Sequence, residues 1–180
     1  MPLIKEKYNK EVIPAMREKF KYSNDLSVPK VLKITLNSGT GAALQDSKML
    51  DVVANTLTRI TGQKPVMTKA GKSIAAFKIR EGMTVGVSVT LRGKRMFDFL
   101  DKLVNVSLPR VRDFQGISSS SLDDQGNLTI GFKEHIMFPE IGSDEIEKIH
   151  GLEVTVSTSA KTKEEGLALL TMLGFPFKKS

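Results

Sequence analysis

The sequence predicts an α+β fold, with a mainly antiparallel β-sheet, helices packed on one face, the other face open and a long basic loop. Several stretches alternate between apolar and polar side chains, as half-buried strands do. Apolar residues at helical spacing lie between them, and strands with a single apolar face are typical of antiparallel sheets. The 180 residues, 40% of them apolar, can bury a sizeable core. We therefore expect one domain, residues 1–180, with a projecting loop around residues 70–84.

The first third of the chain predicts a helix, a strand and a second helix. The opening helix should kink at Pro14, which lacks an amide donor. Residues 31–37 alternate as a strand, and a glycine-containing turn at residues 37–41 follows. The next helix should stop at Gly62. The side chains expected on apolar faces here are Ile4, Tyr8, Val12, Met16, Leu32, Ile34, Leu36, Leu50, Val53, Leu57 and Ile60.

The remaining two thirds predict four strands and two helices. The strands are expected at residues 65–69, 85–91, 127–133 and 152–158, and the helices at residues 96–109 and 162–173, the last one stopped by Gly174 and Pro176. Residues 107–125 and 134–150 resist assignment and read as long loops, which are usually functional in a compact domain. The inward side chains are expected to be Val85, Val87, Val89, Leu91, Met96, Phe97, Leu100, Leu103, Val104, Leu128, Ile130, Phe132, Leu152, Val154 and Val156.

The outward positions of these strands carry short hydroxyls and amides with a few long cations. Such a face can hydrogen-bond to phosphate and 2′-hydroxyl groups of RNA. Threonine also suits strands for its own sake, so composition alone leaves both interpretations open. The outward residues are Lys33, Thr35, Asn37, Ser88, Thr90, Arg92, Thr129, Lys133, Thr155 and Ser157.

One stretch, residues 62–95, carries the whole net charge of the chain. It holds eight basic residues and one acid, a net of +7, while the other 146 residues balance 19 basic against 19 acidic side chains. Glycines between the cations would let backbone amides approach an anion. A solvated loop remains the plain alternative, but such loops usually mix both signs. The pattern favours a polyanion partner, in particular nucleic acid.

Within this stretch, residues 75–80 admit two interpretations. Phe77 and Ile79 could belong to the core. If the loop projects, Phe77 instead becomes an apolar tip between cations, suited to packing on a ribose or base. The sequence does not decide between these.

The sequence argues against an enzyme, and we expect no cofactor and no metal. Gly71-Lys72-Ser73 imitates the end of a phosphate-binding loop, but Val66 stands where its first glycine should be. His135 and His150 lack the further ligands that a metal site needs and are expected at the surface or partly buried.

The chain has no cysteine, no signal peptide and no apolar run long enough for a bilayer, which favours the cytoplasm and no membrane partner. An acidic patch at residues 140–147 is either a solvated loop or a docking surface for a basic protein.

Blocks along essentially the whole chain resemble one family, the bacterial ribosomal proteins that bind 5S ribosomal RNA, fifth in the large-subunit numbering. The blocks occur in the same order as in that family. They are Gly62-Gln63-Lys64-Pro65, Lys72-Ser73-Ile74-Ala75, Phe77-Lys78-Ile79-Arg80-Glu81-Gly82, Val89-Thr90-Leu91-Arg92-Gly93, Leu108-Pro109-Arg110-Val111-Arg112-Asp113-Phe114, Phe138-Pro139-Glu140-Ile141 and Ala160-Lys161-Thr162.

The resemblance implies a structural constituent of the ribosome with several partners. The family attaches 5S RNA to the large subunit in the central protuberance, contacts P-site transfer RNA and bridges to a small-subunit head protein. Large-subunit ribosomal RNA and neighbouring proteins of the protuberance would be further partners. The 5S RNA residues would be Asn37, Gln63, Lys64, Thr68, Lys69, Lys72, Thr90 and Arg92. The transfer RNA loop would be residues 75–82, with Ala76, Phe77, Lys78, Ile79 and Arg80. The bridge would use Arg110, Arg112, Asp113, Phe138, Glu140 and Asp144.

The alternative is a free-standing RNA-binding module that acts outside the ribosome. Modules of the four-stranded type normally stack bases on aromatic side chains of the open sheet face. The outward positions here contain no aromatic residue. This absence favours contacts to folded RNA through shape and backbone.

Overall fold

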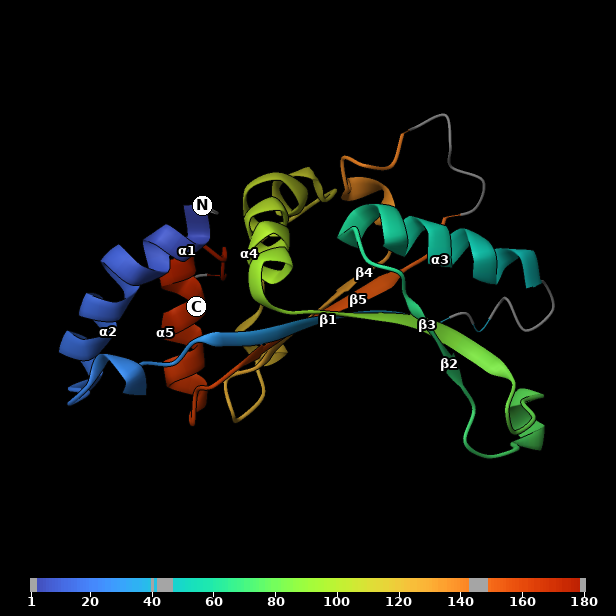
Figure 1. The fold of residues 1–180 in the computed structure, drawn as a ribbon, viewed down its shortest axis with the longest axis horizontal. Coiled ribbons are helices and arrows are strands. Elements are labelled where there is room, and N and C mark those ends of the chain that lie inside the picture. Colours follow the sequence, from blue (N-terminus) through green and yellow to red (C-terminus); the bar gives the residue numbers. More distant parts are fainter. Residues whose placement is uncertain (1–2, 40, 42–46, 143–148, 179–180) are drawn as a thin grey trace. The chain divides into compact units, whose positions relative to one another are not determined.

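The structure, a computed structural model, describes residues 3–39, 41, 47–142 and 149–178. Its five strands form an antiparallel sheet in the order β2-β3-β1-β5-β4, accompanied by helices, so the predicted α+β class is confirmed (Figure 1). The strands are β1 (Val31–Gly39), β2 (Val66–Lys69), β3 (Thr84–Leu91), β4 (Leu128–Phe132) and β5 (Leu152–Thr158). The α-helices are α1 (Leu3–Lys7), α2 (Ile13–Phe20), α3 (Ser47–Thr61), α4 (Gly93–Lys102) and α5 (Lys163–Leu173).

The chain divides into two compact units. The first comprises Met1–Ile34, Leu91–Ile130 and Thr155–Ser180, and the second comprises Thr35–Thr90 and Gly131–Val154. Strands β1, β3, β4 and β5 contribute residues to both units. That the chain acts as a single domain stays a prediction.

In the first unit, the amino-terminal helix is interrupted as Pro14 requires. One π-helical segment, Tyr8–Val12, separates α1 from α2, and Pro14 then falls in the first turn of α2. Proline is tolerated there because the first amides of a helix have no partner within it. The predicted apolar face packs inward, with Ile4, Val12 and Met16 buried. Helix α5 lies beside α2 (Figure 1).

In the second unit, α3 lies along one side of the strands (Figure 1). The predicted stripe of this helix is confirmed, because Val53 and Leu57 are fully buried, as are Leu36 of β1 and Val87 of β3. The helix ends at Gly62, as predicted. Its backbone there is left-handed, with φ +65°, a conformation that glycine adopts without steric cost.

Two apolar residues that were expected to face the core, Leu32 and Phe97, are not buried. Leu32 is 43% exposed although it is in phase with Ile34, because burial also requires another element over that position. In α4, Phe97 is only half-buried and Phe99 is buried instead. Phe99 follows Met96 at the spacing of three that defines one helix face, whereas Phe97 lies about 100° away from Met96. The Phe97 ring instead faces the ammonium group of Lys5, 5.9 Å from its centre.

The two segments without a predicted element contain short helical turns. These are 3-10 turns at Leu108–Arg110, Ser119–Ser121 and His135–Met137, whereas a π-helical turn at Leu103–Ser107 continues α4 within the predicted helix. In the first segment, the carboxylate of Asp123 accepts hydrogen bonds from the amides of Gln125 and Asn127. Such bonds from an aspartate side chain to following backbone amides are typical of a turn. In the second segment, residues 143–148 lie outside the described part of the chain, and with them most of the acidic patch.

Candidate nucleic-acid interface

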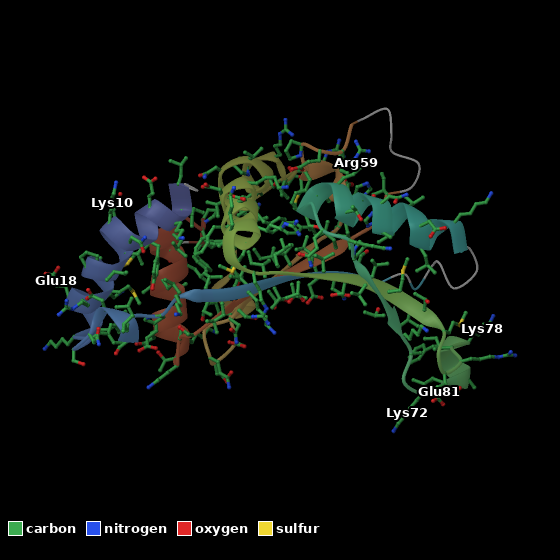
Figure 2. The ribbon with its side chains drawn as sticks, viewed as in Figure 1. Lys10, Glu18, Arg59, Lys72, Lys78 and Glu81 are labelled. Carbon is green, nitrogen blue, oxygen red and sulfur yellow. The ribbon has the colours of Figure 1, made fainter. Side chains whose placement is uncertain are left out.

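All eight basic side chains of residues 62–95 are exposed. None of them is drawn into the core, so the net charge of this stretch is present at the surface as the sequence predicted. Lys72 and Lys78 extend outward from the hairpin that follows β2, and Glu81, the one acid of the stretch, lies on the same hairpin (Figure 2). The basic stretch therefore offers its cations to solvent and to any polyanion that reaches it.

In the second unit, one face of the sheet carries the predicted polar side chains. Val66 pairs with Ser88 and Thr68 with Gly86, and residues paired across antiparallel strands point to the same side. Val87, between Ser88 and Gly86, is fully buried, so this face is the one turned away from the core. Other exposed or half-exposed strand positions of the unit include Asn37, Thr35 and Thr90, and the exposed acid Glu153 between buried Leu152 and Val154 of β5.

Gly86 lets Thr68 lie close over the sheet. A Cβ atom at Gly86 would come within 2.9 Å of Thr68 Oγ1 and 3.0 Å of the Ser38 carbonyl oxygen. Both distances are shorter than ordinary contacts allow, so any larger residue here would displace the Thr68 side chain. A glycine inside a strand often marks such a close approach.

Gln63 and Lys64 follow α3, and Gln63 contacts β3. The Gln63 side-chain amide donates a hydrogen bond to the Thr90 carbonyl oxygen, at 3.2 Å. This bond ties the end of α3 to β3. Lys64 is exposed directly after it. Asn37, Gln63, Lys64, Thr68 and Thr90 thus belong to one compact unit, as do Lys69 and Lys72, whereas Arg92 belongs to the other unit.

Val66 is a feature of this face that the sequence did not single out. Its side chain is 68% exposed on β2, which is an edge strand of the sheet. Exposed apolar residues on edge strands invite association and are usually avoided. Alternation within a four-residue strand does not show which side chains face outward. The pairing of β2 with β3 does, and it places Val66 on the polar face.

The loop after β2 forms a hairpin that is closed by its own hydrogen bonds. The amides of Ile74 and Ile79 each donate to the other residue's carbonyl oxygen, at 2.9 and 3.2 Å. A 3-10 turn, Ala75–Phe77, closes the end, and the Ser73 hydroxyl accepts a hydrogen bond from the Glu81 amide at 2.9 Å. Phe77 is 65% exposed. Of the two interpretations that the sequence left open, a core position for Phe77 is therefore wrong, and the projection of the loop stays a prediction.

The side chains around this tip combine cations with apolar groups. Lys78 and Arg80 are exposed, Ala76 is exposed and Ile79 is half-buried. Ile74, which was not in the predicted set, is also 44% exposed. Lys78 has a left-handed backbone, with φ +54°, which is uncommon for a residue with a side chain. An apolar tip flanked by cations suits ribose, base and phosphate surfaces.

The residues expected to form a bridge fall into two groups. Arg110, Arg112 and Asp113 belong to the first unit and are exposed. Phe138 and Glu140 belong to the second unit, where the Phe138 side chain is fully buried and Glu140 is half-buried. Asp144 lies outside the described residues. Because its side chain is fully buried, Phe138 can stabilise the conformation of its segment but cannot contact a partner.

His135 and His150 differ from the expectation for surface histidines. They are 2% and 6% exposed, and their rings stack with centres 4.1 Å apart. Burial lowers the pKa of both imidazoles, and the neighbouring charge of His135 lowers the pKa of His150 further. Among the described residues, no group of three or more histidine, cysteine or carboxylate side chains could hold a metal ion.

No helix in the described part of the chain combines the length and apolar character needed to cross a membrane.

Comparison with known proteins agrees with this architecture. The model for the C-terminus of the ribosomal L5 protein family matches residues 84–177, more than half of the chain. The model of ribosomal protein L5 matches residues 24–80. Together these two models cover most of the chain, including the basic stretch up to Arg80 and the strand that follows it.

Several relatives are similar over nearly their full length. The large ribosomal subunit protein uL5 of Brevibacillus brevis is 56% identical over 176 residues, 98% of each chain. The uL5 of Carboxydothermus hydrogenoformans is 54% identical over 179 residues, 99% of this chain and 100% of its own. The uL5 of Lacticaseibacillus casei is 54% identical over 176 residues, 98% of each chain. The chain therefore belongs to the ribosomal protein L5 family, which consists of structural, non-enzymatic proteins.

Proposed function

We propose that this chain holds 5S ribosomal RNA on the large ribosomal subunit, within the central protuberance. As a member of its family, the chain is a structural constituent of that subunit. We expect it to act in the cytoplasm as part of the ribosome. The observation that carries the proposal is the charge distribution. The whole net charge of +7 lies in residues 62–95, and all eight cations there are exposed.

The proposed RNA surface is the polar face of the second unit together with Lys69 and Lys72, and Arg92 of the first unit is a further proposed contact. Its residues are Asn37, Gln63, Lys64, Thr68, Lys69, Lys72, Thr90 and Arg92. Cations would neutralise phosphates, while amides and hydroxyls would hydrogen-bond to phosphate and ribose. Because the outward strand positions are aromatic-free, recognition would follow the shape and backbone of folded RNA instead of stacked bases. Large-subunit RNA and neighbouring proteins of the protuberance would surround this surface.

The projecting hairpin has a different proposed partner, P-site transfer RNA. Phe77, exposed at the tip, would pack on ribose or base, and Lys78 and Arg80 would neutralise phosphates on either side. Ala76 and Ile79 would complete the contact. The internal hydrogen bonds of the hairpin support this assignment, since an ordered tip loses little conformational freedom on binding.

For the bridge to a small-subunit head protein, the exposed residues are the better candidates. We assign direct contacts to Arg110, Arg112, Asp113, Glu140 and Asp144. Phe138 would support the segment from inside the core. A basic partner would complement the acidic patch at residues 140–147.

The 5S RNA surface is tested by replacing Lys64, Lys69 and Arg92 together with alanine. The loss of three phosphate contacts should abolish binding at physiological salt and lower the log–log salt slope by roughly 2 to 3. The fold should persist, because all three side chains are exposed. The measurement is a filter-binding or anisotropy titration of 5S RNA at several salt concentrations, with circular dichroism to verify folding.

A matched control removes the same charge elsewhere. Lys10, Lys19 and Lys161 are exposed in the first unit, and their triple alanine variant should bind 5S RNA with a nearly unchanged salt slope. If the first triple variant bound like the wild type, or if both variants lost affinity equally, the assigned surface would be wrong.

The hairpin is tested by replacing Phe77 and Arg80 with alanine. This double variant should bind 5S RNA normally, since the tip is separate from the assigned surface. Ribosomes reconstituted with it should retain P-site transfer RNA less well, measured as its dissociation rate. A large loss of 5S RNA affinity instead would show that the boundary between the two RNA contacts is misplaced.

A further inference from the structure

Thr61, the last residue of α3, has a buried hydroxyl at the junction between the helix and the candidate interface. The residue is 8% exposed. Its hydroxyl donates to the Leu57 carbonyl oxygen at 2.6 Å and accepts a hydrogen bond from the Gln63 amide at 3.3 Å. The Gln63 carbonyl oxygen lies 3.2 Å away as well. A hydroxyl has one proton and two acceptor sites, so it can serve Leu57 and Gln63 at once.

The backbone between these residues turns sharply. Gly62 adopts the left-handed conformation, and its amide donates to the Thr58 carbonyl oxygen at 2.8 Å. The turn brings Gln63 to β3, where its side-chain amide bonds to the Thr90 carbonyl oxygen. Gln63 is thus fixed at two points, by Thr61 through its backbone and by β3 through its side chain.

We propose that Thr61 is a positioning residue of the RNA interface. It touches no RNA itself, but it orients the turn that presents Gln63 and Lys64 beside the polar sheet face. The inference rests on the proposed function in one respect, namely that this face binds 5S RNA. It adds a buried residue that charge and exposure do not reveal, because Thr61 carries no charge and lies inside the unit.

A helix-stabilising role for Thr61 can be separated from a positioning role. Thr56 lies earlier in α3, is 7% exposed, and its hydroxyl makes the same bond four residues back, to the Val52 carbonyl oxygen at 2.9 Å. The replacement Thr56→Val therefore removes an equivalent bond within the helix. It serves as the matched control for Thr61→Val.

The first experiment measures the affinity of the full chain for transcribed 5S RNA. Thr61→Val should weaken binding by roughly two- to tenfold, the range expected for one hydrogen bond. The salt slope should stay unchanged because no cation is lost. Thr61→Ser keeps the hydroxyl and should bind like the wild type, and so should Thr56→Val. If Thr61→Val fails to fold, Thr61→Ser still decides, since a weakened serine variant overturns the proposal.

The second experiment is a double-mutant cycle with Gln63→Ala. If Thr61 acts through Gln63, Thr61→Val should cost clearly less affinity in the Gln63→Ala background than in the wild type. An equal loss in both backgrounds would overturn the proposal, and so would no loss from Thr61→Val alone. Wild-type affinity of Gln63→Ala would instead count against Gln63 in the proposed interface, so the two failures are distinguishable.

Discussion

Lys78 sits at the tip of the basic hairpin in a backbone conformation that glycine would adopt more readily, with φ +54° and ψ +32°. This left-handed conformation costs a residue with a side chain about 1 to 2 kcal/mol. Glycine would remove that cost but would give the unfolded chain more freedom, a loss of about 0.5 to 1 kcal/mol. Lys78→Gly should therefore leave the hairpin as stable as before or up to about 1.5 kcal/mol more stable. In a tip that contacts no partner, lysine would bring no advantage over glycine.

The local stability of the hairpin can be followed at one amide. The Ile79 amide donates to the Ile74 carbonyl oxygen across the hairpin, so its hydrogen exchange reports hairpin opening. In Lys78→Gly this exchange should be unchanged or up to about tenfold slower. Transfer RNA retention on reconstituted ribosomes should nevertheless fall, with a log–log salt slope lower by about 0.7 to 0.9.

Two further variants separate charge from conformation. Lys78→Arg keeps both the cation and the backbone cost and should retain transfer RNA like the wild type. Lys78→Ala keeps the cost and removes the cation, so it should lose retention to the same extent as Lys78→Gly. Transfer RNA retention at wild-type strength in Lys78→Gly would refute a role for the Lys78 cation. Faster exchange of its Ile79 amide would refute the cost assigned to the left-handed backbone.

Two other predictions concern stability. Because burial lowers the pKa of His135 and His150, the unfolded chain binds more protons as the pH falls below about 6.5, and urea unfolding should show stability declining there. His150→Phe should reduce this decline, and a pH-independent midpoint between pH 8 and 5 in the wild type would contradict it. Alanine usually stabilises a helix interior by about 1 kcal/mol over glycine, but a Cβ at Gly166 would collide with the backbone of Gly126, so Gly166→Ala should cost about 1 to 3 kcal/mol. Gly131→Ala, with open space around it, is the control and should be neutral or slightly stabilising; equal effects of the two in thermal melts would refute the steric argument.

Features encoded by neighbouring residues were predictable from the sequence. The alternation of residues 152–158 coincides with β5, and Gly62 and Gly174 end α3 and α5 as predicted. Both glycines have positive φ, which is the reason why glycine stops a helix there. The exposed cations of the basic stretch were predictable for the same kind of reason, since charged side chains stay in water unless they are paired.

Burial of particular side chains was not predictable in the same way. Phe77 could have been core or tip, and its 65% exposure follows from a hairpin closed by the pairing of Ile74 with Ile79. His135 and His150 are 15 positions apart, and only the folded chain stacks them. In both cases the outcome depends on backbone pairing and packing between segments, which periodicity along one segment does not report.

By itself, the sequence of this protein determined the class of fold, the carboxyl ends of α3 and α5, the location of its surplus charge and its family, because each depends on local order along the chain. Only the tertiary structure decided that Val66 shares the polar face with Ser88, that Thr61 holds the turn at Gln63, and that Phe138 is buried. These three facts depend on strand register and on contacts between separate elements. Such contacts exist only once the chain has folded, since the cost of ordering distant segments is offset by what they bury together.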